Sequence, residues 1–460
     1  MKIISFLGLN AYQVTKYLNP ENPNSEFCET KYYQEALAQF YEPDSIYIFL
    51  TQKVEKYSPG KFQKLGDNSD HYVRQSEEKS NWEQLKEIFQ SKYPHVNLIP
   101  VKGIPEQNTV DDIWTIFNKV NECLEEGDEV IFDITHSFRS VPIVALLAVS
   151  YFRVVRDVKI KALIYGAFEA KNTNTNETPT FDLLPVIRLF DWLTATDQFL
   201  KTGNGRDLAS LLRQAVPSEQ ELRLKPETRP IRSHLEKSAK AIESISLALA
   251  ITRPIEAMEA SSNLRSKLED AIPTFEKRAK PFTFLVDRVI QEHGQFSLKN
   301  SRSQDTFVTN LWLQLKMINW YLDYDQVVQA VTLAREWIIS VLVLRFDKPM
   351  FQLYGGRNDV ELALNNGTEV RKKDPRSIKA SPLDDDFEKL PDVVGLTKTW
   401  SKTTELRNDI AHVGMNPNPS QAKKLREQAN NLYDELRVIA DTLLPPMTSP
   451  EADNLSSENC

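Results

Sequence analysis

The chain has 460 residues, of which 41% are hydrophobic and 26% are charged, with 56 Lys and Arg against 64 Asp and Glu. This length exceeds what one ordinary hydrophobic core organises, so two or more domains are expected. The formal net charge of -8 excludes a surface that is basic throughout, and any contact with nucleic acid must therefore be local, through a cleft or a groove.

Cysteine usage and the apolar runs exclude further classes of protein. Cys28, Cys123 and Cys460 lie far apart and form neither a disulfide framework nor a zinc-binding pattern, which fits a reducing cytoplasm. Residues 1–7 predict a short strand and lack the features of a signal peptide. The apolar run 141–152 is shorter than the roughly 20 residues of a membrane helix. We expect a soluble, cytoplasmic protein with no membrane segment.

Residues 1–200 alternate between strand and helix patterns. Helical patterns separate β-rich runs at residues 2–8, 44–51, 96–101, 128–135 and 160–168, and the helical patterns lie at residues 32–40, 82–89 and 111–124. Residues 181–186 are expected to add an edge strand. Such alternation predicts an α/β domain with a mostly parallel sheet that helices cover on both faces.

Two polar turns follow strands of this predicted sheet. The first strand leads into Gly8, Leu9 and Asn10, where a glycine lets a ligand approach the backbone closely. The run IFDITHSFRS at residues 131–140 precedes a predicted helix and offers hydroxyl, imidazole and guanidinium groups. Ligands bind at the carboxyl ends of parallel strands, where the next helix offers free amide donors. In the alternative interpretation, Asp133 and Thr135 are ordinary caps and Arg139 is a surface residue.

Helical patterns dominate after residue 200, which predicts an all-α second part. They lie at residues 206–214, 234–251, 254–271, 281–292 and 323–345. Between them, the proline-rich basic stretch 216–232 predicts a linker or an exposed arm. Arg335 and Glu336 are the only charged residues in the middle of the apolar helix 323–345, and buried charges persist only when paired or functional.

The remaining chain predicts one long polar insertion and two helices. The insertion, residues 355–392, is expected to be a solvated loop, with a role in guiding RNA as the alternative. A helix over residues 400–410 follows, and Ser420 is expected to cap a final helix that ends at Leu444. Residues 446–460 predict a disordered tail.

The helix at 400–410 leads into the sequence RNDIAH, which sets Arg407 five positions before His412. Both side chains can then point to roughly the same side, so that a cation and a proton shuttle face one phosphate. Such a pair can cleave RNA without a metal. Alternatively, Asn408 and Gly414 are cap residues and His412 only bonds carbonyl groups at a helix end.

The pairing of DITHSFR at the end of a strand with RNDIAH in a C-terminal helical bundle resembles the CRISPR-associated CARF-HEPN ribonucleases of type III systems. The likeness spans nearly the whole chain and includes FLGLNAY (6–12), YGAFEA (165–170), DWL (191–193) and QAVTLAREW (329–337). The family usually has a glycine after the histidine of its D-x-T-H-G signature, where this chain has Ser137. Serine still donates hydrogen bonds, but the loop conformation and the ligand size are then less defined.

The resemblance implies a Rossmann-like CARF domain at residues 1–200, a helical connecting region at 201–322 and a HEPN ribonuclease domain at 323–445. It implies a homodimer or higher oligomer that senses cyclic oligoadenylate, with the tetra-adenylate ring favoured, and cuts single-stranded RNA. The products would carry 2',3'-cyclic phosphates, with no metal or cofactor required. The implied catalytic residues are Arg407, Asn408 and His412. The implied ligand contacts are Gly8, Leu9, Asn10, Thr135, His136, Ser137, Phe138 and Arg139.

Two alternatives stay open at this point. One is a ligand-sensing CARF regulator that binds nucleic acid without cutting it, although the sequence shows no helix-turn-helix with a basic recognition helix. The other is a CARF site that also degrades its own activator. The sequence leaves the ring size, the preferred RNA sequence and the proton-transfer role of His412 undefined.

Overall fold

The computed structural model describes residues 1–460 except 57–61, 65–71, 75–78, 107–108, 137–140, 373–378, 416 and 448–460, and it leaves out the side chains of 62–64, 72–74, 141–146 and 149. The chain divides into two compact units, Met1–Phe190 and Asp191–Cys460. The predicted boundaries at residues 200, 322 and 445 stay predictions. Most of the predicted disordered tail lies outside the described residues.

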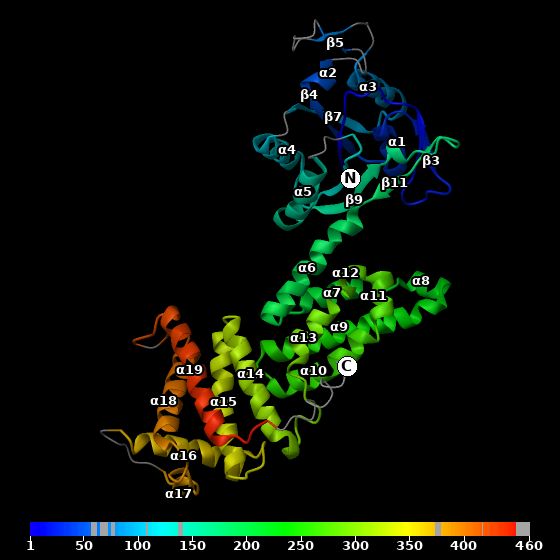
Figure 1. The fold of residues 1–460 in the computed structure, drawn as a ribbon. Helices are drawn as coiled ribbons and strands as arrows, with labels where there is room; N and C mark the ends of the chain where they lie inside the picture. Colours follow the sequence, from blue (N-terminus) through cyan, green and yellow to red (C-terminus); the bar gives the residue numbers. More distant parts are fainter. Residues whose placement is uncertain are drawn as a thin grey trace. The chain divides into compact units, whose positions relative to one another are not determined.

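The first unit is built on a six-stranded sheet (Figure 1) with the strand order β11-β9-β8-β1-β4-β7. All neighbouring strands are parallel except β11, which pairs antiparallel with β9 at the edge. The predicted parallel sheet is therefore confirmed, and so is an edge strand, although it is shorter than the predicted 181–186 because α6 begins at Leu184. The strands are β1 (Lys2–Phe6), β4 (Ser45–Thr51), β7 (Asn97–Ile104), β8 (Glu129–Asp133), β9 (Lys159–Gly166) and β11 (Thr180–Asp182).

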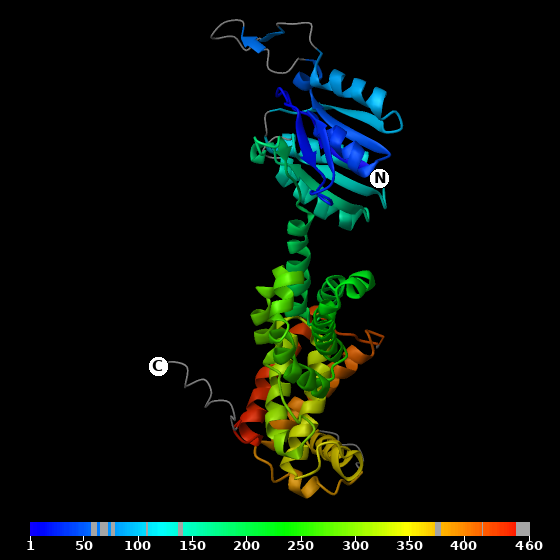
Figure 2. The ribbon, with the colours of Figure 1, turned by 90° about the vertical axis from the view of Figure 1, so that its right-hand side faces the viewer.

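Helices cover both faces of this sheet (Figure 2). Successive residues of a strand point to opposite faces, so neighbouring apolar residues pack against different helices. Ile3 packs with α1 (Tyr33–Tyr41) and α3 (Asn81–Lys92) on one face. Ile4 packs on the other face with α4 (Val110–Cys123), α5 (Val141–Val155) and the start of α6 (Leu184–Thr202). The result is a three-layer α/β/α unit, as a Rossmann-like domain requires.

Three shorter features accompany the sheet. A second, three-stranded sheet consists of β2 (Thr15–Leu18), β3 (Phe27–Thr30) and β10 (Glu177–Thr178). The strands β5 (Phe62–Lys64) and β6 (Tyr72–Arg74) form a hairpin pair, and α2 (Gln52–Lys56) follows β4. The sequence patterns above predict none of these.

The strand order changes direction beside β1. From β1 the chain proceeds to β4 and β7 on one side, and then returns to β8 and β9 on the other side. In an open parallel sheet, ligands bind in the crevice at such a switch point, beyond the carboxyl ends of the strands. The topology therefore predicts a ligand site formed by the residues that follow β1 and β8.

The second unit is helical, and a single hydrophobic core runs through it. The predicted linker at 216–232 is wrong, because α8 and the beginning of α9 occupy it and Pro230 stands among the first residues of α9, where proline is tolerated. The described residues hold α7 (Arg206–Gln214), α8 (Glu219–Leu224), α9 (Arg229–Ala250), α10 (Pro254–Glu269), α11 (Ile272–Arg278), α12 (Lys280–Thr283), α13 (Val286–Gly294), α14 (Phe307–Asp323), α15 (Val327–Arg345), α16 (Asn358–Glu369), α17 (Asp384–Phe387), α18 (Val393–Ala411) and α19 (Ala422–Leu443).

Two other local predictions fail in this unit. The region 355–392 is not simply a solvated loop, because α16 lies in it and buries Val360, Ala363 and Leu364. Its residues 373–378 lie outside the described residues. Ser420 does not cap the last helix, since α19 begins after Gln421 and has no side-chain cap.

The apolar helix α15 is the one helix among the described residues that is long and apolar enough to cross a membrane. Eleven of its 19 residues are buried, and it packs against α14, α18 and α19. Within this unit it is therefore the central core helix.

His293 on α13 makes the stability of the helical unit depend on pH. Its ring stacks on Phe199 with 3.9 Å between centroids, and burial lowers its pKa to about 4 although a bond to the Phe199 carbonyl opposes the shift. The unfolded chain therefore binds the proton first as the pH falls from 6.5 towards 4, and the free energy of unfolding falls in that window.

We expect His293→Gln to reduce this loss of stability. At pH 5 the lowered pKa costs the wild-type chain about 2 kcal/mol, so its Tm should fall further between pH 7.5 and pH 5 than that of the variant. His95→Gln, at an exposed position, is the control and should follow the wild type. Equal falls in all three proteins would contradict the assignment.

Candidate functional site

A pocket of about 340 Å³ opens at the switch point of the sheet. The segment after β1 and the segment after β8 both contribute to its wall, as the predicted site requires. Of the predicted ligand contacts it brings together Gly8, Leu9, Asn10 and His136. Its other lining residues are Phe6, Leu7, Phe49, Thr51, Lys53, Val54, Ile104 and Glu106.

A buried hydrogen-bond network beneath the pocket ties β1 to β8. Asp133, at the end of β8, accepts bonds from the Ser5 hydroxyl at 2.6 Å and from the Thr135 amide at 2.9 Å. Gln34 donates to the Ser5 hydroxyl at 3.0 Å and to the Phe6 carbonyl at 2.8 Å. Burial raises the pKa of Asp133 to about 6, although the bonds from Ser5 and Thr135 oppose this. Asp133 thus joins two strand ends and orders the turn that follows β8.

Thr135 contributes to this framework and is not among the residues that line the pocket. Its hydroxyl accepts a bond from the Gly166 amide at the end of β9, at 2.9 Å. The predicted contact of Thr135 with a ligand stays a prediction. Ser137, Phe138 and Arg139 lie outside the described residues.

His136 presents a neutral imidazole to the pocket at physiological pH. Burial lowers its pKa to about 4, and its ring lies on that of Tyr12 with 4.1 Å between centroids. Its Nε2 atom is buried and has no hydrogen-bond partner among the described residues. A buried polar atom without a partner is costly unless a ligand or water satisfies it, so His136 has the properties of a ligand-binding group.

Two residues that support the pocket are missing from the predicted site. The Tyr12 hydroxyl accepts a bond from the Gly8 amide at 2.7 Å, and a Cβ atom on Gly8 would lie 2.9 Å from that oxygen. Asn81 donates from its amide to the carbonyls of Gly8 and Asn10, at 2.9 and 3.1 Å. A side chain at position 8 would therefore force the Tyr12 hydroxyl to move, and Asn81 fixes the turn from a distant part of the sequence.

A charged pair lies at the wall of the same pocket. Lys53 and Glu106 form an ion pair at 2.7 Å. Burial raises the pKa of Glu106, but hydrogen bonds from Lys53 and Thr51 outweigh it and lower the pKa overall. The Glu106 carboxylate therefore stays charged and neutralises Lys53 at the wall of the pocket.

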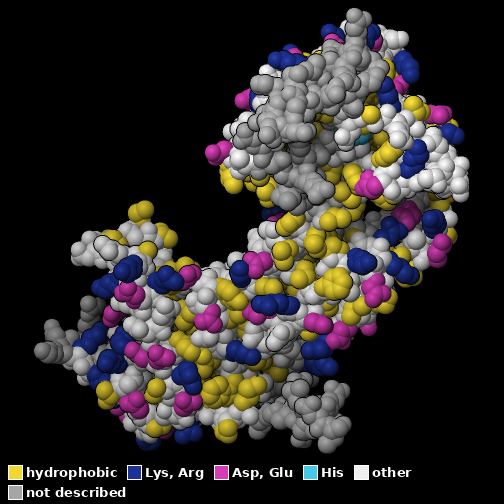
Figure 3. Space-filling model, turned by 45° about the horizontal axis from the view of Figure 1, so that its top comes forward, with side chains coloured by type: hydrophobic (Ala, Val, Ile, Leu, Met, Phe, Trp, Pro, Cys, Tyr) yellow, Lys and Arg dark blue, Asp and Glu magenta, His cyan; other side chains and the backbone are white. Residues whose placement is uncertain are grey.

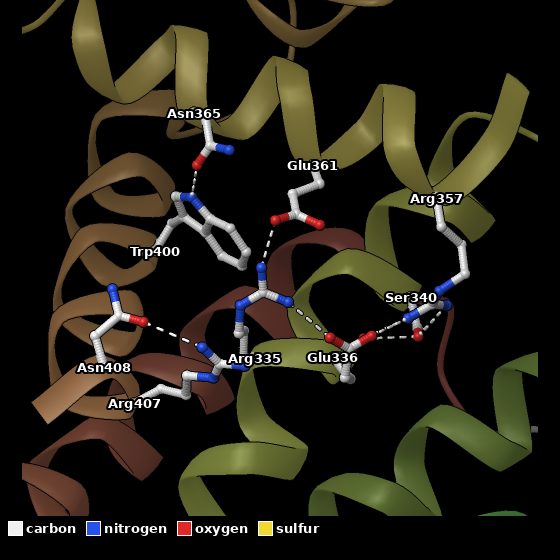
Figure 4. Close-up of polar contacts among 9 residues, drawn as sticks. All are labelled: Arg335, Glu336, Ser340, Arg357, Glu361, Asn365, Trp400, Arg407 and Asn408. Atoms are coloured by element: carbon white, nitrogen blue, oxygen red, sulfur yellow. Dashed lines mark hydrogen bonds and ion pairs between the residues drawn. The ribbon is translucent and has the colours of Figure 1, made fainter. Parts of the chain in front are cut away.

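The second predicted site lies at the end of α18 in the helical unit. Arg407 and Asn408 are exposed, and the Arg407 guanidinium donates to the Asn408 side-chain oxygen at 3.2 Å (Figure 4). His412 is exposed as the residue that ends the helix, with its amide bonded to the Asn408 carbonyl at 3.0 Å. Its imidazole makes no hydrogen bond with any described residue. The structure thus joins Arg407 to Asn408 and leaves the His412 ring accessible.

The chain turns sharply after His412. Val413 and Gly414 both have positive φ angles, 48° and 76°, and the Met415 amide donates to the His412 carbonyl at 2.7 Å. The Ser420 amide donates to the Asp409 carboxylate at 3.0 Å. These bonds close the turn at the end of α18 and define the position from which the His412 side chain extends.

Charges of both signs are interspersed over the helical unit on the face seen in Figure 3. On this face the structure therefore shows no surface that is basic throughout, as the net charge of -8 predicts. Within the described parts of the chain, His, Cys, Asp and Glu side chains form no group of three or more that could hold a metal ion.

Comparisons with known proteins match both units. Residues 2–169 match the family described as "CRISPR system endoribonuclease Csx1, CARF domain", and residues 188–299 match "CRISPR-associated protein MJ1674, second domain". The CRISPR-associated protein MJ1674 of Methanocaldococcus jannaschii is 31% identical over 105 residues, which are 22% of this chain and only 16% of that relative.

Among solved structures, Csm6 of Enterococcus italicus bound to cyclic hexa-2'-fluoro-hexa-dAMP matches 99% of this chain and 97% of its own, with 12% identity and a TM-score of 0.40. The first family match covers every strand of the pocket-bearing sheet except β11, and it includes Gly8 and His136. The second continues into the helical unit, and both families are CRISPR-associated. The chain is therefore a CRISPR-associated protein that contains a CARF domain.

Proposed function

We propose that this protein is a ribonuclease of type III CRISPR defence that cyclic oligoadenylate activates. The observation that carries the proposal is the match of residues 2–169 to a CARF domain described from an endoribonuclease. The exposed Arg407, Asn408 and His412 at the end of α18 supply a second, independent support.

The pocket at the sheet's switch point is the proposed sensor. Its wall combines the turn at residues 8–10 with a neutral imidazole whose Nε2 has no described partner. Backbone amides and helix N-termini suit phosphate oxygens, and a neutral imidazole can donate or accept one hydrogen bond. A ring of adenylates offers phosphates, hydroxyls and base edges to such groups, with the tetra-adenylate favoured by resemblance.

The end of α18 is the proposed catalytic site. Arg407 binds the scissile phosphate and balances its developing charge, while Asn408 holds the guanidinium and His412 transfers a proton. The ribose 2'-hydroxyl is the nucleophile, so the phosphorus–5'-oxygen bond breaks as the 2'-oxygen–phosphorus bond forms. The products carry a 2',3'-cyclic phosphate and a 5'-hydroxyl, and the reaction needs no metal because the substrate contains its own nucleophile.

The proposed assembly is a cytoplasmic homodimer, in which two CARF domains read one symmetric ring and two helical units form one RNA cleft. A two-fold assembly suits a ligand with internal symmetry. Activation is then a shift between two dimer states, and the ring can drive it only by the difference in its affinity for those states.

The test is cleavage of a fluorescent single-stranded RNA by the purified full-length chain, with the tetra- or the hexa-adenylate ring and with chelator present. We expect cleavage with one ring only, at a rate that the chelator does not change, and products that end in 2',3'-cyclic phosphate. Ring binding without any RNA cleavage would overturn the nuclease and favour the regulator. Loss of the ring itself during incubation would identify an activity against the activator.

A further inference from the structure

A cluster of four charged side chains lies between α15 and α16, close to α18 (Figure 4). Arg335 on α15 pairs with Glu336 at 2.7 Å and with Glu361 on α16. Arg357, which immediately precedes α16, pairs with the same Glu336 at 2.8 Å and donates to the Ser340 hydroxyl at 2.9 Å. The cluster carries two positive and two negative charges, so its members neutralise one another.

Arg335 is the member of the cluster that contacts α18. Its guanidinium lies over the Trp400 ring at 5.2 Å from the ring centroid. The indole Nε1 of Trp400 in turn donates to Asn365 on α16 at 2.9 Å. Trp400 is buried, and it is therefore held from α15 by the cation–π contact and from α16 by the hydrogen bond.

Stability alone is a poor reason for this arrangement. The Arg335 side chain is only 17% exposed, in a helix that is otherwise apolar in its middle. Replacing such partly buried ion pairs by apolar residues of similar volume is often neutral or stabilising, because the charges lose their hydration. A guanidinium is planar and its donors have fixed directions, so it holds its partners in one mutual arrangement. Here these partners are two carboxylates and one aromatic ring.

The geometry of α18 connects Trp400 to the proposed catalytic site. Arg407 follows Trp400 by seven residues, which is close to two helical turns, so both side chains leave α18 on the same side. The helix α18 packs against both α15 and α16. A change in how Trp400 sits on α15 would therefore rotate or shift the side of α18 from which Arg407 extends.

We propose that Arg335 is a positioning residue for RNA cleavage, which holds Trp400 and thereby the side of α18 that carries Arg407. This inference rests on the proposed ribonuclease function. Arg335 does not touch the reacting atoms in this role, and it acts only through Trp400.

The test compares Arg335→Met with Arg357→Met in the full-length chain. Both substitutions remove a guanidinium that pairs with Glu336, but Arg357 makes no hydrogen bond, ion pair or ring contact with α18 among the described residues, so it is the matched control. We expect Arg335→Met to lower kcat for RNA by about 10- to 100-fold, because small misplacements of a catalytic group cost that much. The KM for RNA should stay close to the wild type. Arg357→Met should keep the wild-type kcat.

A fluorine signal tests the contact independently of activity. The chain has seven tryptophans, and in protein labelled with 5-fluorotryptophan the signal that Trp400→Phe removes belongs to Trp400. That signal should shift in Arg335→Met and stay in place in Arg357→Met. An unchanged Trp400 signal, or an equal loss of kcat in both variants, would overturn the positioning role.

The outcomes also separate this inference from the proposed function. If the wild-type chain cuts RNA and Arg335→Met cuts it equally fast, only the role of Arg335 is wrong. If the wild-type chain cuts no RNA, the ribonuclease proposal fails and a role of Arg335 in cleavage fails with it, while the fluorine signal still decides whether Arg335 holds Trp400.

Discussion

Replacing His412 with alanine is expected to lower kcat for activated RNA cleavage by about 10²- to 10⁴-fold, the usual contribution of a positioned acid–base group. The imidazole is exposed at the end of α18 and makes no hydrogen bond with described residues, so its removal should leave the packing intact. Single-turnover cleavage of a labelled RNA with saturating ring activator measures the effect, and a wild-type Tm confirms the fold.

Met415→Ala is the matched control for this variant. Met415 is 86% exposed in the same turn, and its backbone bond to His412 survives the substitution. It should cleave RNA at the wild-type rate. Wild-type cleavage by His412→Ala would remove His412 from the chemistry, and an equal loss in Met415→Ala would indicate damage to the turn instead.

The second large effect is expected at the other site, where His136→Ala should weaken the binding of the ring activator by about 10- to 100-fold. The substitution removes a half-buried imidazole that lines the pocket and packs on the Tyr12 ring. One hydrogen bond and its surrounding contacts are worth about 1–3 kcal/mol, and each 1.4 kcal/mol is a factor of ten in Kd. Calorimetric titration with each ring measures the change directly.

His95→Ala is the control, because His95 is an exposed histidine of the same unit. It should bind the ring as the wild type does. A His136→Ala variant that folds and binds the ring with wild-type affinity would place the sensor elsewhere in the molecule.

Long elements with strong patterns were predictable from the sequence. The five β-rich runs became β1, β4, β7, β8 and β9. The pattern is strongest in β1, β4 and β8, whose apolar residues are buried by helices on both sides of the sheet. The three-stranded sheet was not predictable, since β2 and β3 have four residues each and mix charged with apolar side chains. Its strands depend on tertiary pairing, including β2 with the distant β10.

Polar composition misled the predictions for two regions of the helical unit. The stretch 216–232 contains prolines and basic residues, yet it forms helices because Pro226 and Pro230 stand at helix starts, where no amide donor is lost. In 355–392, the apolar stripe of α16 is short and hidden among charged residues. Charge counts over a long window conceal a single helix that buries only one face.

At the sites, the residue types were predictable but their partners were not. The candidate roles in binding or proton transfer follow from residue type and place in the chain for Gly8, His136, Arg407 and His412. A charged residue in an apolar helix, such as Arg335, predicts a partner of opposite charge. No local pattern shows that Asn81 bonds the turn at Gly8, or that Arg335 meets Trp400. Such contacts join positions more than 60 residues apart and exist only once the fold is formed.

The left-handed backbone at Val413 has a consequence for the proposed catalytic site. A branched side chain disfavours this conformation, so the surrounding bonds must enforce it. The bond from the Met415 amide to the His412 carbonyl and the bond from the Ser420 amide to the Asp409 carboxylate do so here. The turn is strained and is held by these bonds, and it thereby fixes the position from which the neighbouring His412 imidazole extends. We expect Val413→Gly to relieve the strain and loosen this turn. Position 413 is therefore a place where the rate of the proposed RNA cleavage could be changed while Arg407, Asn408 and His412 are all kept.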